Sequence, residues 1–229
     1  MTRIVAEPIT IPVDGTDGVS GLWQTASNAK ACFILAHGAG AGMRHPFLES
    51  FASQLAALRV ASLRYQFLYM ERGSKRPDPP KLCHRVVRAA VAEAARRTPV
   101  TLVAGGRSFG GRMTSQAQAE SPLPGVRGLV FLAFPLHPAK QPADDRAQHL
   151  FDIHIPLLFL QGTRDELAEI QLLEPLLAKL GKNASSRLIE SADHSFHVPA
   201  RSGRTDAAVL EELVQTLAQW VDSLADSSV

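Results

Sequence analysis

Three residues of the sequence have side chains and an order suited to nucleophilic catalysis. Ser108, Asp165 and His194 each follow a stretch that we expect to be a buried strand. A serine hydroxyl is a poor nucleophile until a base within hydrogen-bond reach takes its proton. A histidine oriented by a carboxylate is such a base. The three residues therefore predict acyl transfer, with Ser108 as nucleophile, His194 as base and Asp165 as the acid that orients the base.

The strongest local signal surrounds Ser108. Residues 100–104 are apolar and partly β-branched, which predicts a strand, and residues 113–120 predict a helix. Between them, residues 106–110 (GRSFG) fit G-x-S-x-G, a sharp strand-to-helix turn that exposes the serine above a sheet. The alternative is a glycine-rich turn that only begins a helix. The flanking strand and helix favour the catalytic turn.

A second glycine-rich loop, residues 37–42 (HGAGAG), follows the apolar run 31–36. It lacks the Lys-Ser/Thr and the G-x-G-x-x-G register of phosphate-binding loops. We expect it to complete an oxyanion hole, with the N–H of Ala39 acting beside that of Phe109 and Gly40 as the next candidate. An ordinary strand-to-helix turn is the alternative.

Other side chains around these loops have competing interpretations. Gly40 and Arg107 are predicted to contact the substrate. His37 is expected to support its loop by hydrogen bonding. His45 and His137 lie in loops that can face the site, but we expect them to be surface residues.

The base and the acid also have rivals nearby. His197 can replace His194, but His194 lies nearer the end of its strand. Glu166 is expected to cap the next helix, because acidic residues suit a first helical turn. Asp193 is expected to brace its own turn.

The elements that must position these residues alternate along the chain. The sequence predicts strands at 4–13, 19–24, 31–36, 60–65, 100–104, 127–134, 155–161 and 186–190, and helices at 46–58, 81–97, 113–120, 166–180 and 206–224. This pattern predicts an α/β fold: a mostly parallel sheet with helices on both faces. The first two strands are expected to pair antiparallel at one edge. We expect one domain over residues 1–229, and residues 136–155 leave no room for a large cap domain.

The longest irregular stretch is expected at residues 66–80, beyond the carboxyl end of a strand, where ligands bind in such sheets. It carries Arg72, Lys75 and Arg76. These cations either meet an anionic substrate or are simply solvated.

Composition narrows the function classes. The chain has 229 residues, 45% hydrophobic and 20% charged, with a net charge of +2, which is too small to indicate nucleic-acid binding. Cys32 and Cys83 lack metal-like spacing and suggest free thiols in a reducing compartment. We find no signal peptide and no membrane-length apolar run. The predictions are a cytoplasmic location, no metal, no cofactor and no nucleic-acid or membrane partner; the oligomeric state stays open.

On four motifs the chain resembles the α/β-hydrolase superfamily, in its small lid-less, dienelactone-hydrolase-like branch. They are residues 37–40 (HGAG), 106–110 (GRSFG), 162–165 (GTRD) and 193–196 (DHSF), in the serine–aspartate–histidine order of these enzymes. The resemblance implies that Ser108, Asp165 and His194 form a triad. Dienelactone hydrolases usually carry cysteine at the nucleophile position, so their substrate is not implied.

The predicted function is therefore hydrolysis of a small ester or thioester by an acyl-enzyme route. Peptidase or acyltransferase chemistry on the same serine is a further option. The alternative from another class is a hydrolase-like interaction domain with little or no activity, because fold alone does not determine function.

Overall fold

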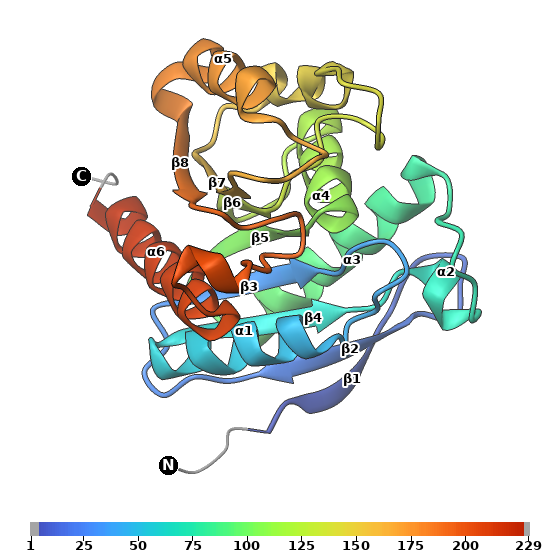
Figure 1. The fold of residues 1–229 in the computed structure, drawn as a ribbon. Coiled ribbons are helices and arrows are strands. Elements are labelled where there is room, and N and C mark those ends of the chain that lie inside the picture. The colour runs from blue at the N-terminus through green and yellow to red at the C-terminus, as the bar shows by residue number, and fades with distance from the viewer. Residues whose placement is uncertain (1–4, 227–229) are drawn as a thin grey trace.

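The computed structural model describes residues 5–226 and has an eight-stranded sheet between layers of helices (Figure 1). The strands are β1 (Glu7–Ile11), β2 (Val19–Gln24), β3 (Ala31–Ala36), β4 (Val60–Tyr65), β5 (Thr101–Arg107), β6 (Val126–Leu132), β7 (Leu157–Gly162) and β8 (Ala184–Ile189). The helices are α1 (Pro46–Ala57), α2 (Leu68–Glu71), α3 (Pro80–Arg97), α4 (Phe109–Glu120), α5 (Ile170–Leu180) and α6 (Asp206–Asp226). Short 3₁₀ segments are η1 (Asp145–Asp152), η2 (Gly181–Asn183) and η3 (Ala200–Ser202).

The sheet is mostly parallel, as predicted. Its order is β1-β2-β4-β3-β5-β6-β7-β8. The β1–β2 and β2–β4 pairs are antiparallel and all the other pairs are parallel, so the expected antiparallel edge is confirmed. Since β5 lies between β3 and β6, the loops that follow these three parallel strands lie side by side at the carboxyl ends of the strands.

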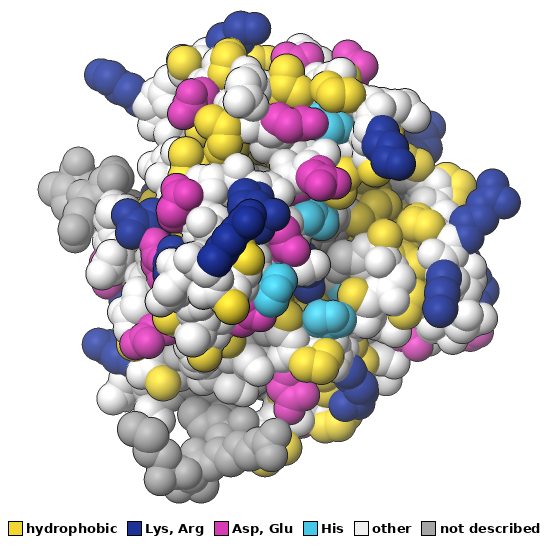
Figure 2. Space-filling view, in the orientation of Figure 1, with side chains coloured by type: hydrophobic (Ala, Val, Ile, Leu, Met, Phe, Trp, Pro, Cys, Tyr) yellow, Lys and Arg dark blue, Asp and Glu magenta, His cyan; other side chains and the backbone are white. Residues whose placement is uncertain are grey.

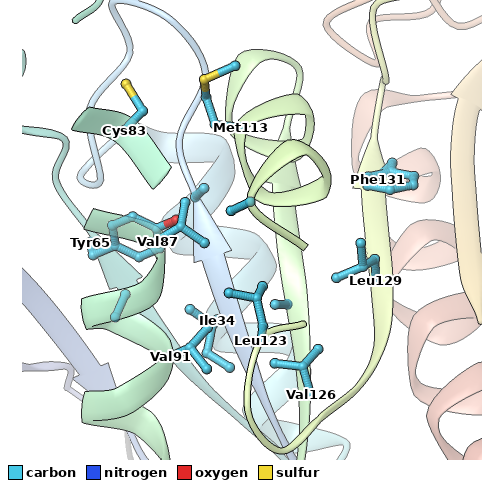
Figure 3. Packing of buried hydrophobic residues seen from close by; sticks show 14 of the residues in the cluster. Ile34, Tyr65, Cys83, Val87, Val91, Met113, Leu123, Val126, Leu129 and Phe131 are labelled. Atoms are coloured by element: carbon cyan, nitrogen blue, oxygen red, sulfur yellow. The ribbon is translucent and has the colours of Figure 1, made fainter. Parts of the chain in front are cut away.

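Two hydrophobic cores cover the two faces of the sheet. Alternate residues of β3 belong to different cores, with Ile34 in one and Phe33 and Leu35 in the other. Helices α3, α4 and α5 cover the first face, and α1 and α6 cover the second (Figure 1). Figure 3 shows side chains of the first core packed between α3, α4 and the strands.

Several boundaries differ from the predictions. Strand β5 continues to Arg107 and α4 begins at Phe109, because close neighbours fix the glycine-rich turn in this shape. Residues 66–80 are not wholly irregular, since they contain α2. The observed first strand, β1, is shorter than the predicted strand at 4–13, and Ile4 lies outside the described residues. Helix α5 begins at Ile170, so Glu166 does not cap it, and that prediction is wrong.

Both cysteines are free, as expected, and the structure buries them both. No helix within residues 5–226 combines the length and apolar character needed to cross a membrane.

Candidate active site

Ser108 occupies the turn between β5 and α4 in a strained conformation. Its φ is 49° and its ψ is −115°, values that residues other than glycine rarely adopt. Its N–H donates to the carbonyl of Leu132 at 2.9 Å, which ties the turn to the neighbouring strand β6. The backbone thus holds the serine at the carboxyl end of the central strand.

The two glycines of the G-x-S-x-G motif are required by close backbone approach. A Cβ on Gly106 would lie 2.4 Å from the carbonyl oxygen of Ala36, at the end of β3. A Cβ on Gly110 would lie 2.5 Å from the carbonyl oxygen of His37. Only glycine lets β5 and α4 pass this close to β3, as the sequence pattern predicted.

The structure brings the three sequence-predicted residues together. His194 Nε2 lies 2.8 Å from Ser108 Oγ, and His194 Nδ1 lies 2.7 Å from Asp165 Oδ2. With Nδ1 donating to the carboxylate, Nε2 is the acceptor for the serine O–H. This arrangement has the geometry of a nucleophile, a general base and an orienting acid.

Asp165 is 2% exposed and its carboxylate is held from three sides. Besides His194, Oδ2 accepts from Gln161 Nε2 at 2.5 Å, and Oδ1 accepts from the N–H of Leu167 at 2.8 Å. These donors fix the carboxylate plane toward His194. Residues 166–169 consequently form a loop around Asp165 instead of the first turn of α5.

The rival residues lie around His194 but do not take part in the hydrogen bonds between Ser108, His194 and Asp165. His197 is exposed and pairs with Asp206 at 2.9 Å. Asp193 accepts from the N–H groups of Ser195 and His197 at 2.7 and 3.0 Å, the turn-bracing role expected for it. Glu166 is exposed.

The two predicted oxyanion donors lie on adjoining backbone segments. Phe109 is the first residue of α4, where the helix offers its N–H no acceptor. Ala39 is exposed in a turn closed by the N–H of Ala41 donating to Gly38 at 3.2 Å. A Cβ built on Gly38 would lie 3.9 Å from the Cβ of Ser108, so this turn borders the serine.

His37 supports its loop from within. It is fully buried, and its Nε2 accepts the N–H of Phe67 at 3.1 Å while Nδ1 donates to the carbonyl of Gly38 at 2.8 Å. Burial lowers the pKa of His37 to about 4, opposed in part by the bond to Gly38, so the ring is neutral near pH 7.

Arg107 precedes the nucleophile, and burial and then the charge of Arg107 lower the pKa of nearby His45. The Arg107 guanidinium lies 5.0 Å from the ring centre of Phe47, which in turn stacks on Phe196 at 5.7 Å. Burial lowers the pKa of Arg107, while the charges of Asp193 and Asp165 raise it. His45 is half-buried and caps α1, with Nδ1 accepting the N–H of Phe47 at 3.2 Å.

Sequence reasoning missed two supporting residues. His137 is fully buried, so its prediction as a surface residue is wrong: Nδ1 faces the carbonyl of Pro138 at 2.8 Å and Nε2 bonds to Glu169. Gln161 donates to Asp165 from within β7. A polar residue inside the apolar run of that strand was a detectable signal for Gln161, whereas His137 gave none.

Among residues 5–226, no group of three or more His, Cys, Asp or Glu side chains is arranged to hold a metal ion.

Comparison with known proteins identifies the family of this chain. Residues 29–222 match the family described as an alpha/beta hydrolase domain, and the chain belongs to that family.

Solved structures show the same fold. The dienelactone hydrolase of Anabaena variabilis aligns with a TM-score of 0.75 and 20% identity over 95% of this chain and 97% of that chain. A lid-less α/β serine hydrolase from Xanthomonas campestris aligns with a TM-score of 0.72 and 20% identity, over 94% of this chain and 95% of that chain. An α/β serine hydrolase homologue from Coxiella burnetii aligns with a TM-score of 0.72 and 18% identity, over 92% of this chain and 97% of that chain. The predicted superfamily is thereby confirmed, and membership supports hydrolase activity. The fold is shared with a dienelactone hydrolase and with a lid-less serine hydrolase, the branch that the sequence motifs resemble.

Proposed function

We propose that this protein is a serine hydrolase that cleaves a carboxylic ester or thioester through Ser108, His194 and Asp165. One observation carries the proposal: His194 bridges the serine hydroxyl and the aspartate carboxylate with contacts of 2.8 and 2.7 Å. A histidine in that position takes the serine proton as the hydroxyl attacks, and the carboxylate stabilises the imidazolium that forms.

The reaction has two halves. Ser108 Oγ bonds to the carbonyl carbon as its proton passes to His194 Nε2. The tetrahedral intermediate then expels the alcohol or thiol, which takes that proton and leaves an acyl-serine. Water next attacks the acyl-serine, with His194 again receiving and returning a proton, and the carboxylic acid departs.

The negative charge of each intermediate needs fixed donors. We assign this role to the N–H groups of Phe109 and Ala39, the first at the amino end of α4 and the second in the turn beside Ser108. Such donors, already aimed at the developing charge, contribute about 3–4 kcal/mol to transition-state stabilisation in hydrolases of this kind. Gly40 and Arg107 flank these groups and are proposed to contact the substrate.

The surroundings of the site favour a small substrate. On the face drawn in Figure 2, a hollow between the positions of α4 and α2 has a largely hydrophobic lining, with histidine side chains at its border. The connection between β6 and β7 contains only η1, so no large cap covers the site. An open, partly apolar hollow suits short or flexible acyl groups.

A fluorophosphonate probe tests the proposal, because it labels only activated serines. Labelling of the wild type at Ser108, located by mass spectrometry of the modified peptide, is expected to disappear in Ser108→Ala and His194→Ala. His197→Ala is the matched control and should label normally. A folded wild type that stays unlabelled would contradict the triad and favour an interaction domain.

A further inference from the structure

A second functional group lies one helical turn beyond the nucleophile. The N–H of Arg112 in α4 donates to the carbonyl of Ser108 at 3.1 Å. Side chains of a helix lean toward its amino end, and the Arg112 guanidinium accordingly lies over the ring of Phe109, 5.9 Å from its centre. The Phe109 ring itself contacts Phe67, which precedes α2, and Tyr69 within α2. This cation therefore lies against the ring of the residue that follows the nucleophile, and the same ring packs on α2.

Arg112 has no counter-charge in the described part of the chain. Its Nε is buried without a hydrogen-bond partner, and no carboxylate lies within ion-pair distance of its guanidinium among residues 5–226. A desolvated arginine normally has a carboxylate or another acceptor, because an unpaired buried charge is costly.

A second arginine increases the positive charge. Arg146 of η1, which packs on α4, is half-buried and also has no carboxylate partner among the described residues. Burial, and then the charge of Arg146, lower the pKa of Arg112. The next polar pair in this region is neutral: Ser115 Oγ lies 2.7 Å from Nε2 of His149, and burial and Arg112 lower the pKa of that histidine to about 4. The charge of Asp152, at the end of η1, opposes this lowering of the His149 pKa, but Asp152 forms no ion pair with either arginine, so both cations lack a paired carboxylate among the described residues.

We infer that Arg112 and Arg146 form a subsite for an anionic group, a carboxylate or a phosphate, on the substrate. This inference rests on the proposed function and specifies its substrate class: an ester or thioester that carries a negative charge on its acyl part or on its leaving group. The ligand's anion supplies the acceptor that the Arg112 guanidinium lacks, and guanidinium groups bind such oxyanions with paired hydrogen bonds.

Two matched substrate pairs test the inference and separate the two positions of the charge. For the acyl part, mono-4-nitrophenyl adipate is compared with 4-nitrophenyl hexanoate. For the leaving group, 4-acetoxybenzoate is compared with 4-acetoxybenzamide. The readout is the ratio of kcat/KM for the anionic ester to that for the neutral ester. We expect a wild-type ratio above one in at least one pair, and a fall of about 10-fold or more in Arg112→Gln or Arg146→Gln.

Control variants isolate the effect of the charge. Arg112→Lys should recover part of the ratio. Arg96→Gln, in the last turn of α3 and with an exposed side chain paired to Glu93, should leave the ratio unchanged. Arg146→Gln keeps the test valid if Arg112→Gln does not fold, as judged by circular dichroism. Equal ratios in the wild type and both glutamine variants would overturn the inference while leaving the hydrolase intact.

Binding decides the matter if no ester is hydrolysed. Calorimetric titration of Ser108→Ala with the same four esters needs no turnover. Tighter binding of an anionic member, lost on adding Arg112→Gln, supports the subsite. Equal or absent binding of the anionic and neutral members by this folded variant refutes it. A failure of the proposed hydrolase is therefore distinguishable from a failure of the anionic subsite.

Discussion

The N–H of Phe67 donates to Nε2 of His37 across 3.1 Å, so the proton of this buried imidazole must be on Nδ1, where it reaches the carbonyl of Gly38. One neutral histidine therefore joins the loop after β4 to the loop that carries the predicted oxyanion donor. Protonation of Nε2 would break the bond from Phe67, because a protonated nitrogen cannot accept.

We expect this histidine to make the stability of the fold depend on pH. Its pKa falls from an ordinary 6.5 to about 4 on folding, so the unfolded chain binds a proton first as the pH decreases. The stability from neutral His37 is present above pH 6.5 and is lost toward pH 4. Between pH 7 and pH 5 the loss from this group should be about 2 kcal/mol.

Urea unfolding at the two pH values measures that loss. His37→Gln keeps a donor and an acceptor but does not titrate, so its decrease should be smaller by the same amount. His154→Gln, at an exposed position between η1 and β7, should behave as the wild type does. A pH dependence that is identical in His37→Gln and the wild type would contradict this account.

The hydrogen bond from His194 to Asp165 predicts a large effect of Asp165→Asn. The amide cannot stabilise the imidazolium and favours the wrong tautomer, so kcat on a 4-nitrophenyl ester should fall by about 10³–10⁴-fold. Gln161→Leu removes only a neighbouring donor to the same carboxylate, and a fall of about 10-fold is expected. An Asp165→Asn protein that kept a tenth of wild-type kcat would show that another group orients the base.

The pair of buried His137 and partly exposed Glu169 predicts a stability effect near the acid. Nδ1 of His137 donates to the carbonyl of Pro138 and Nε2 bonds to the Glu169 carboxylate. Glu169→Ala leaves a fully buried ring nitrogen without its partner, which should lower the unfolding free energy by about 1–3 kcal/mol. Glu166→Ala, three positions earlier and exposed, should change it by less than about 0.5 kcal/mol. Equal effects in urea unfolding would mean that the pair does not stabilise this loop.

Two glycines near the serine predict opposite tolerance to alanine. Gly110→Ala places a Cβ 2.5 Å from the carbonyl of His37 and should destabilise by about 1–3 kcal/mol or prevent folding. The nearest atom to a Cβ on Gly38 is 3.7 Å away, the carbonyl oxygen of Arg107, so Gly38→Ala should fold with near-normal stability. Thermal unfolding compares the two, and a Gly110→Ala protein as stable as Gly38→Ala would refute the close approach.

The sequence predicted strand bounds best where helices bury both faces of the strand. Strand β3 has the predicted bounds, because a strand covered on both faces is a continuous apolar run. The serine, aspartate and histidine were identifiable because the carboxyl ends of parallel strands lie on the same side of the sheet. Residues that follow these strands are therefore close in space although they are distant in sequence.

Other features depend on contacts that the local pattern does not encode. The last residues of β5 include glycines, which usually weaken a strand, but here the adjoining strands approach too closely for a side chain. Residues 166–169 look helical, yet the N–H of Leu167 is committed to Asp165 and its carbonyl accepts the N–H of Leu136. The same tertiary contacts bury His137, and its position in a loop does not predict this burial.

The ring of Phe47 contacts both sides of the reaction centre. Arg107, which precedes the serine, lies against it, and so does Phe196, two residues beyond the histidine. Phe47 is half-buried, so either loop would expose more of this ring to water if it moved away from α1. Local opening should therefore be cooperative, with the amide hydrogens of the serine turn and of the histidine loop exchanging with solvent deuterium at a common rate. The contacts of a single aromatic side chain would then couple the local opening of the turn that carries the nucleophile to that of the loop that carries the base.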